Sequence, residues 1–225
     1  MSVDVQQAVL LTVWTSILGT VWAFPIAIGA GWLLARKSFP GRTVLSALLL
    51  APMVLPPVAI GIFLLAFLGA QGPFGDIGIV LTWRGVVVAG GLMAFPLMAR
   101  SCRAAFEGVD RRLEAVSRTL GLGPWQVFWQ VTLPLARRGL LAGLVLGFAR
   151  CLGEYGATIT LAGNIPGRTQ TLSGAMMAAF DAGRDTDLRW LLAGTLLLGV
   201  GATALAEMLV EGEFSVKARS EGANQ

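Results

Sequence analysis

The sequence predicts an all-α integral membrane protein, a helical bundle with about five transmembrane helices. Of the 225 residues, 55% are hydrophobic and 13% are charged, and the mean hydropathy is +0.72. A soluble domain of this length usually carries about a quarter charged residues. Residues 5–35 and 43–75 contain no charged side chain, and each run exceeds the roughly 20 residues that cross a bilayer as a helix.

Hydrophobic runs place the individual spans. We expect membrane helices at approximately 8–35, 44–69, 84–106, 139–163 and 189–210, which form one transmembrane domain over 8–210. The remaining segments are a long polar loop at 107–138 and a tail at 211–225. The first run lacks a basic leader and is longer than the apolar part of a signal peptide, so it is expected to be a retained helix.

Basic residues predict the orientation, because loops on the inner side of a membrane are enriched in Lys and Arg. With the N-terminus outside, the inner segments 36–42, 100–138 and 211–225 hold twelve Lys and Arg residues. The outer segments hold four, namely Arg84, Arg168, Arg184 and Arg189. The distribution predicts an N-terminus outside and a C-terminus inside.

Proline and glycine interrupt the predicted spans. Pro25, Pro96 and a group at positions 52, 56 and 57 each remove a backbone donor and kink or break a helix. Freed carbonyls cannot face lipid, so these helices must pack in protein or line a cavity. Gly139, Gly143 and Gly147 form a four-residue repeat that allows another helix to approach closely. Any one of these features fits tight packing, whereas their number favours a bundle that moves.

The loop at 107–138 is amphipathic. Its first half alternates charged residues with apolar ones, and Gly121-Leu-Gly-Pro124 is a turn signal. Trp125 and Trp129 follow in a second apolar stretch. We expect two short helices at an angle on the inner membrane face, either resting on headgroups or receiving a partner.

Charged and polar residues within the fourth span are candidates for function. Arg150 and Glu154 are four residues apart, and charges inside a membrane are costly and often functional. They either pair with each other and brace the bundle or contribute to a transport path. Thr158, Thr160 and Asn164 supply hydroxyl and amide donors, which bind an anion without trapping it.

Several kinds of chemistry are not expected. The chain has no His and only two Cys, and the spacing of Cys102 and Cys151 fits no metal site, so we predict neither metal nor cofactor. A phosphate-binding loop needs G-x-x-x-x-G-K-[ST], and the stretch from Gly31 to Ser38 has Arg36 where the second Gly must be. The chain is therefore expected not to hydrolyse ATP, and nothing in it indicates nucleic-acid binding.

The 107–138 loop resembles the conserved cytoplasmic loop of bacterial ABC importer permeases. That motif reads E-A-A, three residues, Gly, nine residues, Ile, one residue and Leu-Pro. Gly121, Val131 and Leu133-Pro134 occupy the later positions, while Glu114-Ala115 stands one place early. The resemblance implies that these residues, together with Gly123, couple the chain to an ATPase.

Further segments resemble the permeases of molybdate importers along nearly the whole chain. They lie at 36–41, 51–57, 83–85, 93–97, 106–110, 118–123, 148–158 and 164–167. Gly153-Glu-Tyr-Gly156 is also similar to sulfate permeases. The resemblance implies a multi-pass inner-membrane homodimer that works with two cytoplasmic ATPase subunits and an external oxyanion-binding protein.

The expected function is therefore import of molybdate, with sulfate or tungstate as the alternative substrate. A secondary transporter without an ATPase, or a structural membrane protein, are alternatives of another class. A secondary transporter would show inverted internal repeats and acidic residues without an ion-pair partner along a relay, and the sequence shows neither feature.

Overall fold

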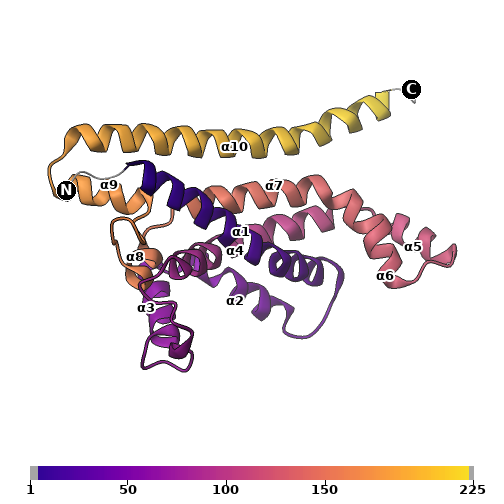
Figure 1. Cartoon of the computed structure of the whole chain (residues 1–225). Coiled ribbons are helices and arrows are strands. Elements are labelled where there is room, and N and C mark those ends of the chain that lie inside the picture. The colour runs from indigo at the N-terminus through magenta and orange to yellow at the C-terminus, as the bar shows by residue number, and fades with distance from the viewer. Residues whose placement is uncertain (1–4, 223–225) are drawn as a thin grey trace.

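The computed structural model describes residues 5–222, and in the last helix it describes side chains as far as Gly201 and those of Thr203, Ala204 and Met208. All regular elements within this range are helices (Figure 1). The prediction of an all-helical fold is confirmed for the described residues.

Three long helices form the centre of the bundle: α1 (Val5–Arg36), α4 (Trp83–Glu107) and α7 (Leu133–Leu152). They share a core that is rich in small side chains, with the larger Met98 and Phe106 fully buried. A Cβ at Gly139 would lie 2.7 Å from Ala105 Cβ, and one at Gly143 would lie 2.9 Å from Ser101 Cβ. The glycine repeat therefore brings α7 against α4, as predicted.

The second predicted span is not one helix. Residues 44–69 form α2 (Arg42–Val54) and α3 (Pro57–Leu68), which are bent by 108°. Leu55 between them is extended, with φ −72° and ψ 145°. The residue before a proline disfavours the helical region, and neither Pro56 nor Pro57 can donate a backbone hydrogen bond, so the helix ends here. A short 3₁₀ turn, η1 (Gly75–Ile77), follows α3, and both project away from the bundle (Figure 1).

The fourth predicted span is also interrupted. Helix α7 ends at Leu152, and a second helix, α8 (Gly156–Ala162), begins after a break of three residues. The expectation of one continuous helix over 139–163 was wrong, because Gly153 gives little support to a helix interior.

Two more helices pack at the N-terminal end of α1. Helix α9 (Leu172–Asp181) packs between the start of α1 and α10 (Asp185–Gly222), around Ala8, Ala175 and Leu191. Helix α10 covers the predicted span 189–210 and continues into the predicted tail, much of which lies outside the described side chains. Figure 1 shows α10 along one side of α7.

The 107–138 segment contains less loop than predicted. Helix α5 (Arg111–Thr119) is followed by a turn, and α6 (Pro124–Val127) continues through a π-helical turn, η2 (Phe128–Thr132), into α7. Leu133 N–H donates to Phe128 O, five residues back. Pro134 clashes with the carbonyl four residues earlier in a regular helix, and the wider turn relieves that clash. The second short helix is thus an extension of α7.

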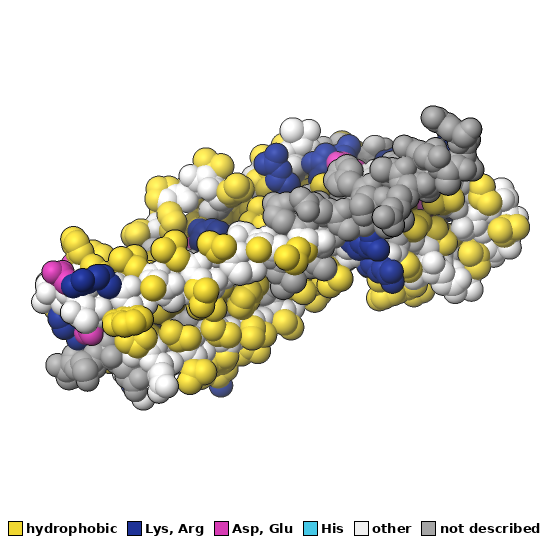
Figure 2. All heavy atoms as spheres, turned by 90° about the horizontal axis from the view of Figure 1, so that it is seen from above, with side chains coloured by type: hydrophobic (Ala, Val, Ile, Leu, Met, Phe, Trp, Pro, Cys, Tyr) yellow, Lys and Arg dark blue, Asp and Glu magenta, His cyan; other side chains and the backbone are white. Residues whose placement is uncertain are grey.

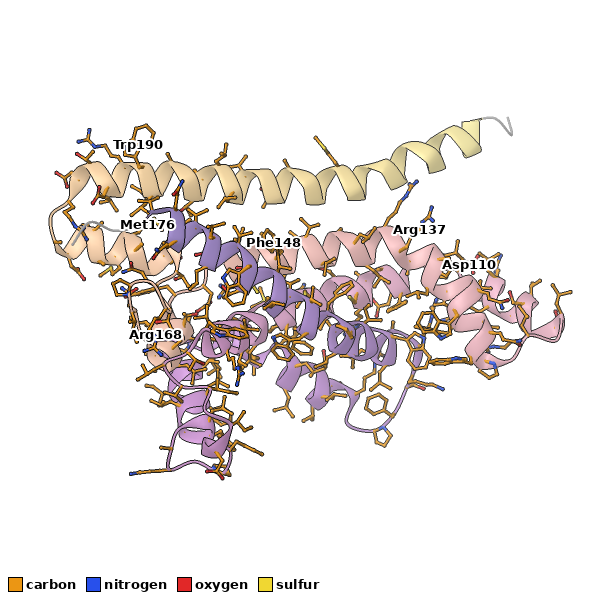
Figure 3. The ribbon with its side chains drawn as sticks, viewed as in Figure 1. Asp110, Arg137, Phe148, Arg168, Met176 and Trp190 are labelled. Atoms are coloured by element: carbon orange, nitrogen blue, oxygen red, sulfur yellow. The ribbon has the colours of Figure 1, made fainter. Side chains whose placement is uncertain are left out.

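Three described helical stretches are long and apolar enough to cross a membrane, Val5–Arg36, Trp83–Glu107 and Pro124–Leu152, and the bent pair α2–α3 is a fourth if it counts as one span. Apolar side chains dominate the face in Figure 2. In Figure 3, Asp110 and Arg137 lie toward one end of the molecule, and Arg168, Met176 and Trp190 lie toward the other. Charged groups thus flank an apolar middle.

Candidate functional site

Two helix breaks meet inside the membrane domain. A Cβ at Gly156, the first residue of α8, would lie 2.8 Å from Pro57 Cβ, at the start of α3. One at Gly61 would lie 2.6 Å from Thr160 Cβ. The interruption between α7 and α8 therefore abuts the one between α2 and α3. Broken helices at membrane depth are tolerated where protein or a water-filled cavity covers them, and they often form transport sites.

An ion pair bridges the α7–α8 break. Arg150 Nη1 lies 2.7 Å from Glu154 Oε2, and the exposed fractions of the two side chains are 34% and 2%. Glu154 Oε1 also accepts a hydrogen bond from Ala157 N–H at 3.0 Å, in the first turn of α8. The carboxylate thus joins the end of one helix to the start of the next. The pair expected on one helix face exists, but Glu154 lies in the break.

Glu154 faces the interior of the chain. It lines a small cavity of about 10 Å³ together with hydroxyl groups of α1 and with Thr158 and Thr171. Such a volume corresponds to about one water molecule. Thr158 is itself buried. These contacts favour the bracing interpretation for Glu154.

The other two polar candidates lie apart from this cavity. Thr160 Oγ1 donates to Gly156 O at 2.9 Å within its own helix. Asn164 Nδ2 donates to Gly174 O at 2.9 Å and so fixes α9. The five predicted residues are therefore not brought together in a single site.

Glu114 ties the start of the 107–138 segment to the bundle. Its Oε1 lies 2.9 Å from Arg36 Nη2, at the end of α1. The same oxygen accepts a hydrogen bond from Thr132 Oγ1 at 2.7 Å, just before α7. The side chain of Glu114 is nearly buried. Although this residue stands one place early in the sequence motif, it connects three elements.

The turn after α5 depends on Gly121. Its φ is 90°, in the left-handed region, and a Cβ there would meet nothing within 4 Å. The constraint at this position is therefore the backbone conformation and not a close neighbour. Gly123 has an ordinary φ of −68°, and its N–H donates to Gln126 Oε1 at 2.8 Å.

The remaining motif residues differ in exposure. Ala115 and Pro134 are exposed, whereas Val131 and Leu133 are half-buried. Leu133 packs against the central core. The segment also exposes a cluster of large apolar side chains, namely Leu113, Val116, Leu120, Trp125 and Trp129.

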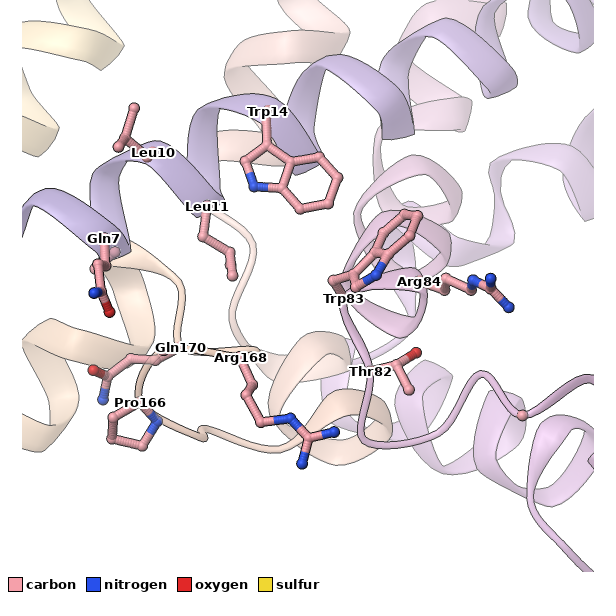
Figure 4. Close-up of a pocket in the computed structure, with 13 residues that line it drawn as sticks. Gln7, Leu10, Leu11, Trp14, Thr82, Trp83, Arg84, Pro166, Arg168 and Gln170 are labelled. Atoms are coloured by element: carbon pink, nitrogen blue, oxygen red, sulfur yellow. The ribbon is translucent and has the colours of Figure 1, made fainter.

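A large pocket that the sequence did not predict lies at the opposite end of the molecule, where Figure 3 shows Arg168, and Figure 4 shows the side chains that line it. Its volume is about 920 Å³, and its lining comes from the start of α1, the segment before α4 and the loop before α9. Arg84 and Arg168 contribute positive charge to it, and the rings of Trp14 and Trp83 pack with their centroids 5.0 Å apart. The two arginines are far apart in the sequence, and no spacing signal links them.

A family comparison decides what kind of protein carries this arrangement. The family described as "Binding-protein-dependent transport system inner membrane component" matches residues 23–211. The chain belongs to this family. The permease is accordingly a multi-pass inner-membrane subunit of an ABC importer, as the sequence predicted, and the alternatives of a secondary transporter and of a structural protein are wrong.

Individual relatives agree with this assignment. The permease is 48% identical over 177 residues to the molybdenum transport system permease protein ModB of Escherichia coli (strain K12), covering 76% of this chain and 77% of that one. The corresponding protein of Haemophilus influenzae is 44% identical over the same shares. The sulfate transport system permease protein CysW of Synechococcus elongatus is 34% identical, over 75% of this chain and 61% of the relative.

Solved structures show the same fold. A structure of the MetNI methionine ABC transporter in inward facing conformations superposes with a TM-score of 0.70, covering 94% of the permease and 99% of that chain. The sequence identity is 19%, so this likeness concerns the fold alone.

Proposed function

We propose that the permease imports molybdate. The observation that carries this proposal is its 48% identity, over three quarters of the chain, to a molybdenum transport permease. Sulfate or tungstate is the alternative substrate, and the 34% identity to a sulfate permease supports the oxyanion class as a whole. Arg84 and Arg168 in the large pocket supply the positive charge that attracts a dianion.

The proposed orientation puts the N-terminus and the large pocket outside. The segments 36–42 and 100–138, which together hold ten of the 17 Lys and Arg residues, then face the cytoplasm. In this orientation an external binding protein reaches the pocket. The C-terminus of the fifth proposed span, within α10, lies inside.

A homodimer is proposed from the α2–α3 break. Helix α2 has no buried residue in the single chain, and Val54 and Leu55 at the break are 83% and 47% exposed. The break leaves backbone polar groups without helical partners, which is costly in lipid. A second copy of the chain would cover this region, and the polar path would run between the two copies.

The cytoplasmic ATPase is proposed to dock on the α5–α6 turn. Leu120 in this turn is 79% exposed, and Trp125 in α6 and Trp129 in η2 are 70% and 51% exposed. Large aromatic and aliphatic side chains of this kind serve as anchors in protein interfaces. The Arg36–Glu114–Thr132 contacts would transmit movement of the turn to α1 and α7, with Gly121, Gly123, Ala115, Val131, Leu133 and Pro134 shaping the docking segment.

Uptake measurements test the substrate and the energy source together. The permease, its ATPase subunit and its binding protein are reconstituted in proteoliposomes with ATP, and uptake of radiolabelled molybdate is measured in competition with tungstate and sulfate. We expect molybdate uptake that requires both ATP and the binding protein. Preferred uptake of sulfate at equal concentration would contradict molybdate as the substrate.

A further inference from the structure

A second pocket lies at the Arg36 end of the molecule, between the end of α1 and the α5–α6 segment. Its volume is about 300 Å³. We call it the basic pocket, and its lining consists of Trp32, Arg36, Lys37, Arg111, Glu114, Arg118, Pro124, Val127, Phe128 and Thr132. Four cationic side chains and one carboxylate therefore surround a space large enough for a small ion.

The positive charge of the basic pocket is only partly neutralised. Arg36 binds Glu114 and donates to Val109 O at 3.0 Å, both through Nη2. Its Nε is buried and has no acceptor among the described residues. Arg111 Nη2 donates to a backbone carbonyl, that of Ala35, at 3.0 Å. A carbonyl accepts a hydrogen bond without removing a net charge, so the pocket keeps an excess of cations.

The remaining two cations lie at the exposed side of the pocket. Lys37 and Arg118 are exposed, and Lys37 Nζ lies 5.9 Å from the centroid of the Trp32 ring. They come from two different elements, the end of α1 and the end of α5. Arg and Lys side chains that face one cavity are a common means by which proteins bind phosphate-like anions.

We propose that the basic pocket binds one tetrahedral oxyanion, supplied either as a free phosphate-like ion or as the phosphate of a lipid headgroup. The volume accommodates such an ion, and the guanidinium groups present planar donors that match its oxygens. A bound anion would join Lys37 to Arg118 and thus the end of α1 to the proposed docking segment. The inference goes beyond the transported substrate, because this pocket lies at the opposite end from Arg84 and Arg168.

The test measures phosphate binding to the assembled transporter. The permease–ATPase complex is placed in phosphatidylcholine nanodiscs, a non-hydrolysable nucleotide fills the ATPase sites, and inorganic phosphate is titrated calorimetrically. Lys37→Gln and Arg118→Gln are each expected to weaken binding about fivefold, and the double variant roughly twentyfold. Arg112→Gln, an exposed residue of α5 outside the pocket, removes the same charge and should change binding less than about twofold.

A second arm distinguishes the lipid source. The complex is isolated from membranes that contain phosphatidylglycerol, and bound lipid is counted by native mass spectrometry. Retained lipid that is lost in the Lys37→Gln, Arg118→Gln double variant and kept in Arg112→Gln would assign the site to a headgroup. Absence of both phosphate binding and retained lipid would overturn the proposal, as would an equal loss in the Arg112→Gln control.

Discussion

The Arg150–Glu154 pair gives the sharpest prediction, because its two members are buried unequally. The Glu154 side chain is 2% exposed and that of Arg150 is 34% exposed. Arg150→Met leaves a buried carboxylate without its counter-ion, whereas Glu154→Gln leaves an arginine that is one-third exposed. We therefore expect the arginine variant to be the less stable of the two.

The magnitudes follow from the contacts. Removing one partner of a buried pair costs about 3–5 kcal/mol, and we expect the lower end for Arg150→Met because the hydrogen bond from Ala157 N–H to Glu154 remains. Glu154→Gln keeps an acceptor for that N–H and is expected to cost about 1 kcal/mol. For a chain of this length, 1 kcal/mol corresponds to roughly 2–4 °C in Tm, so Arg150→Met should lower the Tm by about 6–12 °C.

The double variant separates bracing from transport. Arg150→Met with Glu154→Gln removes both charges and keeps the acceptor, so its stability should return to within about 1 kcal/mol of the wild type. Thermal unfolding of the purified protein and molybdate uptake per folded protein are measured for all four forms, with exposed Arg137→Met as the matched control. If the pair braces the break, the double variant regains both stability and uptake.

Two results would refute this reasoning. Wild-type stability of Arg150→Met would show that Glu154 does not depend on the arginine. A double variant that is stable but inactive would assign Arg150 to the oxyanion path instead.

Two further predictions concern orientation and the docking turn. Single cysteines are introduced at Ser38 or Arg168, both of which are exposed, whereas the native Cys102 and Cys151 are buried. The cysteine at position 38 should react with a membrane-impermeant maleimide only from inside, and the one at position 168 only from outside. Labelling of position 38 in intact cells would reverse the orientation. Gly121→Val forces a β-branched residue to φ 90°, at a cost of about 1–2 kcal/mol, and should reduce ATP-driven uptake. Gly108→Ala, at φ −70° and with only ordinary contacts for the added Cβ, should not. Normal uptake by Gly121→Val would remove this turn from the coupling path.

Hydropathy predicted the bounds of two long helices, α1 and α4, closely because these helices depend mainly on local composition. Helices α1 and α4 span nearly the ranges expected at 8–35 and 84–106. The prolines at 52, 56 and 57 marked the α2–α3 region as irregular. A missing backbone donor does not by itself decide whether a helix kinks or breaks, and the 108° bend depends on what packs around it. The α7–α8 break carries no proline, and its signal, Gly153, is weak.

The sites divide in the same way. The sequence by itself determined the membrane class and the family motif, and it singled out Arg150, Glu154 and the turn at Gly121, because each of these depends on residues that are close along the chain. The tertiary structure alone placed Arg84 and Arg168 in the lining of one pocket, joined Glu114 to Arg36 and Thr132, and gathered four cations around the basic pocket. Contacts between distant residues follow from how helices pack, and helix packing depends on the shapes of whole surfaces that no local pattern encodes.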